Sequence, residues 1–430
     1  MATKKITGLS SETKVLHQGY DPNLSVGSVI SPIYPNSTYV FPSAKAGERA
    51  FELAFFPERA LPGESPSLIY SRMNHPNAEI LEDKLVQVEP GAGAAAVFGS
   101  GMSAIVTTVL ALLNRGTGSH KKTVVYSNPV YGGSDYFFKH NLPTLGGKAV
   151  EIETWNHKKT KQLIESLGDE IGMLYLETPA NPTLVMTDID EVAKIAKKAN
   201  PDCIVVVDNT FLGIFQQPFK IGQLVDVIVY SATKFMSGHA HLIAGVTMVR
   251  EECKELIQAI KGWRTSFGTI ANPQVCWELE NSIKMYNLRM NSQAERATKV
   301  AKFLSRHPMI ERVRHPSLLT EADVDYKIYQ RQCTGPGSVI TIDLKNPSKE
   351  YAFKFLDVLG RDNIIALAVS LGGVESLVEH PASMTHSEVS EQDRAIAQIT
   401  DATIRFSIGL ENPDDLISII SKAFDEIGCS

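Results

Sequence analysis

The chain has 430 residues, a formal net charge of −6, 43% hydrophobic residues and 21% charged residues. This length predicts two or three domains, the composition excludes an intrinsically disordered protein, and the acidic balance argues against nucleic-acid binding. No apolar run is long enough to cross a membrane and the N-terminus lacks the apolar stretch of a secretory signal, so we expect a cytoplasmic protein without a membrane partner.

Cysteine and histidine, the residues that most often ligate zinc, show no metal-binding spacing. The five cysteines at positions 203, 253, 276, 333 and 429 form no CxxC pair, which is typical of reduced thiols in a cytoplasmic protein. His239 and His241 are metal ligands by type, but no third ligand accompanies them. We therefore predict no metal site and expect a structural or substrate-entrance role for the two histidines.

Residues 1–68 are predicted to form an extended N-terminal arm, irregular over about its first 60 residues. Seven prolines between positions 22 and 66 should break any long helix in it. The stretch 61–67 has the composition of an exposed loop. Because such a segment is not expected to fold alone, we expect it to wrap another part of the protein or a partner subunit.

Residues 69–265 are predicted to form an α/β domain. Helical spacing at 78–89 precedes an apolar strand at 94–98, a Gly99-Ser-Gly101 turn and a helix at 102–113. Further apolar strands are expected at 123–126, 173–176, 204–208, 227–230 and 246–249, and Asp188 is expected to cap a helix at 189–199. Strands that alternate with helices in this way indicate a mostly parallel sheet.

Residues 266–430 are predicted to form a smaller C-terminal αβ domain. It begins with a helix-rich segment at 273–306. Strands are expected at 338–344 and 403–408, and helices at 351–359 and 413–427. The boundary between the two domains is placed near residue 265.

An acid and a lysine follow two neighbouring predicted strands. Asp208 ends the strand at 204–208, and Lys234 lies in Ser231-Ala-Thr-Lys234 after the strand at 227–230. In open α/β sheets, ligands bind beyond the carboxyl ends of the strands. Pyridoxal phosphate (PLP) requires such a pair, because a lysine amine forms a Schiff base with its aldehyde and a carboxylate keeps its pyridine nitrogen protonated. On its own, a lysine after a strand is usually a solvated surface residue, and an aspartate there is often a helix cap.

Other residues around this pair have both a functional and a structural interpretation. Backbone N–H groups near Gly101 and Met102 can hold a phosphate with hydroxyl groups of Ser231 and Thr233, although a tight turn also requires glycine. Tyr131 follows a strand end, where it can stack on a flat ring or simply pack. Arg405 lies in an otherwise apolar strand and needs a partner, which is either a protein carboxylate or the α-carboxylate of a substrate.

The order and spacing of these motifs resemble a known family. The most specific block runs from Asp208-Asn-Thr-Phe to Ser231-Ala-Thr-Lys-Phe, with support from Tyr70-Ser-Arg72, Glu177-Thr-Pro-Ala-Asn-Pro-Thr183 and Ser370-Leu-Gly-Gly-Val-Glu-Ser-Leu-Val-Glu-His-Pro381. From about Thr13 to its end, the chain resembles the Cys/Met-metabolism, or trans-sulfuration, PLP enzymes. The family contains cystathionine γ-synthases, cystathionine γ- and β-lyases and methionine γ-lyases.

The resemblance implies fold type I, a homotetramer built as a dimer of dimers, and a role for each motif residue. Lys234 would hold the cofactor and carry protons, Asp208 would pair with the pyridine nitrogen, and Tyr131 would stack on the ring and act as a base. Ser370 and Arg405 would bind the substrate carboxylate. The remaining cofactor-binding residues implied are Gly101, Met102, Ser231, Thr233, Thr210, Asn181 near the ring hydroxyl, and Tyr70 and Arg72, which would reach the phosphate of the neighbouring subunit.

The chain departs from the family pattern where substrate choice is expected to be decided. His75-Pro-Asn77 replaces the usual Asn-Pro-Thr, Gly238-His-Ala-His241 replaces Gly-His-x-Asp, and the loop at 52–67 is longer than usual. Cystathionine γ-lyases resembling this chain carry Glu, Arg and Glu where it has Ile69, Tyr136 and Val369. Methionine γ-lyases resemble it at Val369 but usually have cysteine at the position of Gly133.

These positions favour a carbon–sulfur lyase, because an apolar environment suits a short thioether better than a charged distal group. Elimination would release a thiol from methionine or cystathionine and hydrogen sulfide from homocysteine, with ammonia and a 2-oxo acid in each case. The alternative is a γ-replacement transferase of cystathionine γ-synthase or sulfhydrylase type, which uses an activated homoserine ester.

Two other classes of protein are less consistent with the sequence. A nucleotide-binding protein would need a G-x-G-x-x-G or Walker motif, which is absent. A cofactor-free homologue would not be expected to keep Lys234, Asp208, Tyr131 and Arg405 together.

Overall fold

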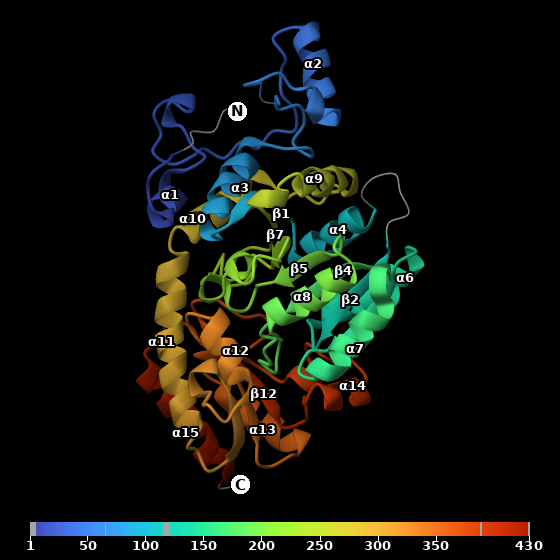
Figure 1. The fold of residues 1–430 in the computed structure, drawn as a ribbon. Helices are drawn as coiled ribbons and strands as arrows, with labels where there is room; N and C mark the ends of the chain where they lie inside the picture. Colours follow the sequence, from blue (N-terminus) through green and yellow to red (C-terminus); the bar gives the residue numbers. More distant parts are fainter. Residues whose placement is uncertain (1–5, 65, 115–120, 388, 429–430) are drawn as a thin grey trace.

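The computed structural model describes residues 6–64, 66–114, 121–387 and 389–428. Figure 1 shows the N-terminal arm at one end of the molecule, the C-terminal region at the other, and the larger sheet between them. Within the described ranges, no helix has both the length and the apolar character needed to cross a membrane. The four described cysteines form no disulfide bond with one another, and Cys429 lies outside these ranges.

The larger sheet has seven strands in the order β1-β7-β6-β5-β4-β2-β3. Strands β2 to β6 are parallel, whereas β7 pairs antiparallel with both β1 and β6. This arrangement confirms the predicted mostly parallel sheet and adds one unpredicted strand, β3. The strands are β1 (Ala92–Phe98), β2 (Thr123–Asn128), β3 (Lys148–Glu153), β4 (Ile171–Glu177), β5 (Ile204–Asp208), β6 (Val227–Tyr230) and β7 (Gly245–Arg250).

Helices cover both faces of this sheet. Alternate residues of β5 enter different cores: Val205 and Val207 pack on one side, and Ile204 and Val206 on the other. Burial on both faces explains why β5 is a continuous apolar run rather than an alternating one. One face carries α4 (Gly101–Leu113) and α9 (Leu256–Phe267), and the other carries α3 (Pro76–Val88), α7 (His157–Leu167), α8 (Ile189–Ala199) and α10 (Pro273–Ile283).

The second sheet has five strands in the order β10-β11-β12-β9-β8 and a core of its own. Its strands are β8 (Ile310–Arg314), β9 (Val339–Leu344), β10 (Ile365–Leu367), β11 (Ser376–Glu379) and β12 (Thr403–Ser407). The accompanying helices are α11 (Tyr286–Leu304), α12 (Val324–Gln332), α13 (Lys349–Leu359), α14 (Glu391–Ile396) and α15 (Pro413–Gly428). The predicted boundary at residue 265 falls inside α9, and the division into arm and two domains stays a prediction.

The arm is more ordered than its prolines suggested. Besides the short α1 (Ser11–His17), it forms the twelve-residue α2 (Ala44–Phe55), so the expectation of an irregular segment is wrong there. Pro42 and Pro57 flank this helix instead of interrupting it, and the Ser43 side chain caps it by accepting a hydrogen bond from the Ala46 N–H group at 3.1 Å. The predicted loop at 52–67 therefore begins inside α2; Ser65 lies outside the described residues.

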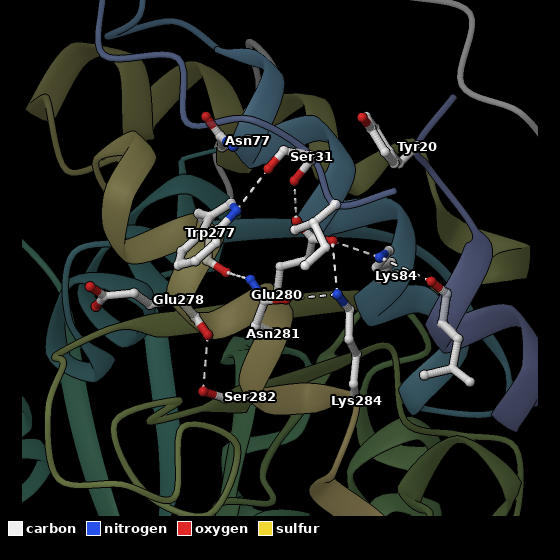
Figure 2. A network of polar contacts seen from close by, with 12 residues as sticks. Tyr20, Ser31, Asn77, Lys84, Trp277, Glu278, Glu280, Asn281, Ser282 and Lys284 are labelled. Carbon is white, nitrogen blue, oxygen red and sulfur yellow. Dashed lines mark hydrogen bonds and ion pairs between the residues drawn. The ribbon is translucent and has the colours of Figure 1, made fainter. Parts of the chain in front are cut away.

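A buried ion pair fixes the base of the arm (Figure 2). Lys84 of α3 and Glu280 of α10 lie 2.6 Å apart with side chains only 2% and 1% exposed. The second carboxylate oxygen of Glu280 accepts a hydrogen bond from the Ser31 hydroxyl at 2.7 Å, and the Trp277 indole N–H donates to the Ser31 carbonyl at 2.8 Å. The arm therefore adds hydrogen-bond partners to both members of the pair, because the Lys84 amine also donates to the Leu16 carbonyl at 3.3 Å.

Replacing Lys84 by methionine is expected to destabilise the protein by about 3–5 kcal/mol, because it leaves the Glu280 carboxylate buried beside only the more distant Lys284 amine. Thermal unfolding and amide hydrogen exchange over residues 14–34 would measure the effect. The double variant K84M/E280L should recover most of the loss, since an apolar pair needs no ionic partner. An unchanged unfolding midpoint for K84M would contradict this account.

Candidate active site

A cavity of about 290 Å³ opens at the carboxyl ends of β4, β5 and β6. It is bounded by the start of α4 and closed on the far side by the second sheet. Eleven of the thirteen site residues predicted from the sequence line it. They are Gly101, Met102, Tyr131, Asn181, Asp208, Thr210, Ser231, Thr233, Lys234, Ser370 and Arg405.

The Lys234 amine points at the second sheet. Its Nζ donates a hydrogen bond to the Ser370 hydroxyl at 2.8 Å. Burial lowers the pKa of Lys234 to about 8, the nearby Arg405 charge adds to this effect, and Glu379 opposes it. A lysine with a depressed pKa is partly neutral near pH 7 and is a better nucleophile and proton acceptor.

Asp208 is buried at the end of β5 and receives donors on both oxygens. Its Oδ1 accepts hydrogen bonds from the Thr210 N–H group at 3.0 Å and the Thr210 hydroxyl at 2.6 Å, and its Oδ2 accepts one from the Tyr175 hydroxyl at 3.0 Å. Burial raises the pKa of Asp208, and the Thr210 hydrogen bonds oppose this rise. A cationic ring nitrogen beside this carboxylate would favour its ionised form.

The start of α4 meets the turn after β6 without space for a side chain between them. A Cβ atom added at Gly101 would lie 2.8 Å from the Ser231 Cβ atom. The first N–H groups of a helix have no acceptor within the helix and attract anions. The Thr233 hydroxyl bonds to the backbone of Ala244 instead: it donates to the Ala244 carbonyl at 3.2 Å and accepts from the Ala244 N–H group at 3.0 Å.

Tyr131 forms one wall of the cavity and is held by Glu177. The Tyr131 N–H group donates to Oε2 of Glu177 at 2.8 Å, and the Asn181 N–H group donates to Oε1 at 3.0 Å. Burial, together with the Asp208 charge, raises the pKa of Glu177 to about 8. A Cβ atom at Gly133 would lie 2.7 Å from the Tyr131 ring, so this tyrosine conformation excludes the cysteine expected there in methionine γ-lyases.

Arg405 has a protein carboxylate as its partner, one of the two partners considered for it from the sequence. It is 2% exposed on β12, pairs with the Glu379 carboxylate at 2.9 Å and donates to the Asn181 side-chain oxygen at 3.0 Å. It also donates to the Ser370 carbonyl. Because Arg405 lines the cavity as well, a protein carboxylate partner and a role toward a substrate carboxylate are compatible.

Ser370 itself adopts a positive φ of 92°. This conformation is rare for a residue with a side chain and is often found at functional sites. The contacts made by Lys234 and Arg405 from opposite sides hold it in place. The hydroxyl is thus presented to the cavity beside the lysine amine.

Tyr70 and Arg72 do not line the cavity of their own chain. The Arg72 guanidinium donates to the Thr265 carbonyl at 2.7 Å and lies 5.7 Å from the Tyr70 ring centroid. Tyr70 is 42% exposed. Their predicted role at the site of a neighbouring subunit stays a prediction.

Sequence reasoning assigned no role to several further lining or supporting residues, among them Glu177, Phe211, Ile243, Thr385 and Glu379. Glu177 ends β4 as Asp208 ends β5, so the rule that found Asp208 also applied to it. Glu379 and Thr385 come from the second sheet region, and Thr385 donates to Glu379 at 2.9 Å. No local pattern connects them to the first sheet.

His239 and His241 lie close to each other. Their ring centroids are 5.5 Å apart, and the His241 ring nitrogen lies 3.9 Å from Glu278. Across the part of the chain that the structure describes, no group of three or more His, Cys, Asp or Glu residues is placed to hold a metal ion. Their role as structural or entrance residues stays a prediction.

The lining residues fit PLP by chemical type. Helix α4 and Ser231 provide donors for a phosphate, Tyr131 an aromatic face, Asp208 a buried carboxylate for a ring nitrogen, and Lys234 a partly neutral amine. Because Gly101 has no side chain between the start of α4 and Ser231, the first N–H groups of α4 and the Ser231 hydroxyl lie together at the phosphate end.

Comparison with known proteins covers nearly the whole chain. Residues 12–425 match the family model described as Cys/Met metabolism PLP-dependent enzyme. An L-methionine γ-lyase of Fusobacterium nucleatum is 35% identical over 416 residues, which are 96% of this chain and 98% of the relative. A cystathionine γ-lyase of Bacillus subtilis is 33% identical over 420 residues, 97% of this chain and 100% of the relative.

A solved structure of cystathionine γ-synthase from Xanthomonas oryzae pv. oryzae in complex with cystathionine superimposes with a TM-score of 0.84 at 28% identity. The superposition covers 98% of this chain and 100% of that one. These matches confirm the predicted fold type I and the predicted cofactor, pyridoxal phosphate. The chain belongs to the Cys/Met-metabolism family of PLP-dependent enzymes.

Proposed function

We propose that this enzyme is a carbon–sulfur lyase that eliminates a thiol from a thioether amino acid, with methionine or a similarly short substrate preferred and cystathionine also accepted. The products are a thiol, ammonia and a 2-oxo acid. The relatives named L-methionine γ-lyase and cystathionine γ-lyase support this reaction class.

The apolar rim of the cavity carries the proposal. Val369 and Ile243 are 54% and 63% exposed and line the cavity. Of the charged lining residues, Asp208 and Lys234 would face the cofactor and Arg405 would hold the α-carboxylate. The fourth, Glu177, accepts hydrogen bonds from the Tyr131 and Asn181 N–H groups. A charged distal group would therefore lack a partner among these residues, whereas a short thioether needs none.

The chain's own residues can carry out the proton movements of an elimination. PLP, when bound, accepts the electron pair left on Cα after its proton departs. Arg405 would hold the α-carboxylate with its guanidinium fork, and Ser370 would orient the same end of the substrate. The Lys234 amine, with a pKa of about 8, would take the Cα proton and deliver a proton where the thiol leaves.

A product assay with the purified holoenzyme tests this function. Methionine, cystathionine, homocysteine and cysteine are each incubated alone, and thiol, ammonia and 2-oxo acid are measured. Release of all three from methionine without an added nucleophile is the expected result. Strict dependence on a second nucleophile, with a homoserine ester as the first substrate, would instead establish a γ-replacement transferase, a class to which the structurally similar cystathionine γ-synthase belongs.

We further propose an oligomer, a homotetramer built from dimers, in which Tyr70 and Arg72 complete the site of a neighbouring subunit. Within the described ranges, half of the exposed large hydrophobic residues lie between positions 9 and 70, which is unusual for a free surface. Mixing the variants R72A and K234A after reversible dissociation should restore activity to some sites, whereas the same treatment of either variant alone should not.

A cytoplasmic location stays a prediction from the reduced cysteines.

A further inference from the structure

A buried hydrogen-bonded chain lies behind the turn that follows β5. The Asn209 side-chain amide donates to the Tyr230 hydroxyl at 2.7 Å, and this hydroxyl donates to Oε2 of Glu89 at 2.6 Å. Asn209 also accepts a hydrogen bond from the Gln216 amide at 3.0 Å. Glu89, Asn209 and Tyr230 are 2%, 0% and 3% exposed, and none of them lines the active-site cavity.

The hydrogen-bonded chain of Asn209, Tyr230 and Glu89 and the residues of the active site hold the same turn from opposite sides. Asn209 lies between Asp208 and Thr210, and Tyr230 directly precedes Ser231. On the cavity side, the Ser231 N–H group donates to the Thr210 hydroxyl at 2.9 Å, and that hydroxyl donates to Asp208. The ends of β5 and β6 are therefore connected twice, once at the cofactor side and once behind it.

The surroundings of Glu89 do not suit an ionised carboxylate. Among the described residues, no Lys, Arg or His nitrogen is within ion-pair distance, and Oε1 has no hydrogen-bond partner. The groups that face it are the hydroxyls of Tyr230 and Tyr286 and the more distant, exposed Lys220. Burial raises the pKa of Glu89 to about 8, against the Tyr230 hydrogen bond and the Lys220 charge.

We propose that Asn209, Tyr230 and Glu89 are positioning residues. Their hydrogen bonds fix the conformation of the turn that carries Asp208 and Thr210. Glu89 keeps its proton in the folded protein, so that this hydrogen-bonded network stays neutral. This inference rests on the proposed roles of Asp208 and Thr210 at the cofactor. It assigns no contact with cofactor or substrate to the three residues.

The variant Y230F tests the connection to the cofactor. It keeps the ring and removes the hydroxyl that joins Asn209 to Glu89. We expect a PLP dissociation constant about tenfold higher than in the wild type, on the scale of one lost buried hydrogen bond. The matched control T403V removes an equally buried hydroxyl, which donates to Asp343 in the second sheet at 2.8 Å, and should lower thermal stability without changing the cofactor dissociation constant. Equal dissociation constants for Y230F and wild type would overturn the positioning role.

The variant E89Q tests whether Glu89 keeps its proton, and this test does not depend on whether Y230F folds. An unfolded chain releases this proton near the ordinary carboxyl pKa, whereas the folded protein keeps it up to about pH 8, so the stability of the wild type falls as the pH rises between these limits. Glutamine retains the acceptor for Tyr230 but does not titrate.

The unfolding midpoint of full-length E89Q should therefore rise relative to the wild type from about pH 5 to about pH 8, with the cofactor bound or removed. The exposed control E321Q should show no such relative change. A difference between E89Q and wild type that does not vary with pH would show that Glu89 is ionised and would overturn this part of the inference. An error in the role of Asp208 would appear separately, in the cofactor spectrum of D208N.

Discussion

Replacing Lys234 by alanine is expected to reduce the turnover of every substrate by about a thousandfold or more, the upper scale for loss of a proton-transfer group. The reason is its position: Nζ lies 2.8 Å from the Ser370 hydroxyl, and no other lysine in the described part of the chain lines the cavity. Its lowered pKa makes it the one lining amine that can both attach to an aldehyde and accept a proton.

Steady-state 2-oxo acid formation and the absorbance of the bound cofactor measure this effect. The spectral band of the lysine-bound cofactor should disappear in K234A, and borohydride should no longer attach the cofactor to the protein. Lys302→Ala, an exposed lysine on α11, is the matched control and should behave like the wild type. If K234A kept both the spectrum and the turnover, the proposed site would be wrong.

The second large effect is expected for Asp208→Asn, which should lower turnover by about a hundredfold or more, the scale for removing one electrostatic group from an active site. Asparagine has the same shape but cannot balance a protonated ring nitrogen. Its amide nitrogen would also face donors, because Thr210 and Tyr175 together occupy both oxygens of Asp208. One of these donors would lose its acceptor inside a buried site.

Single-turnover measurements and the cofactor dissociation constant separate the two consequences. Loss of the charge should slow proton removal from Cα, and loss of the hydrogen bond should weaken cofactor binding. Asp357→Asn, an exposed acid on α13, serves as the control. A D208N enzyme with wild-type turnover would show that this carboxylate does not face the ring nitrogen.

Much of the first sheet and its site was predictable from the sequence because both follow from local patterns. Apolar runs such as β5 mark strands that are buried on two faces, and parallel strands end at a common edge. Asp208 and Lys234 could therefore be placed together from the ends of β5 and β6, which pair in the structure. The resemblance to a known family then assigned a role to each motif residue.

The arm shows where local reasoning failed. Counting prolines predicted an irregular segment, yet Pro42 and Pro57 only mark the ends of α2. Proline breaks a helix from its interior and is harmless at its flanks. The position of each proline therefore mattered more than their number.

The sequence by itself determined the strands, the glycine turn, the acid–lysine pair and the family, since each depends on residues close together in the chain or on their order. Only the tertiary structure decided that Glu379 accompanies Arg405, that Ser370 meets the Lys234 amine, and that Glu89 lies behind the Asp208 turn. These contacts join residues 26 to 141 positions apart. Their partners are selected by burial, because a charge or hydrogen-bonding group removed from water must find whatever partner the packed chain brings near it.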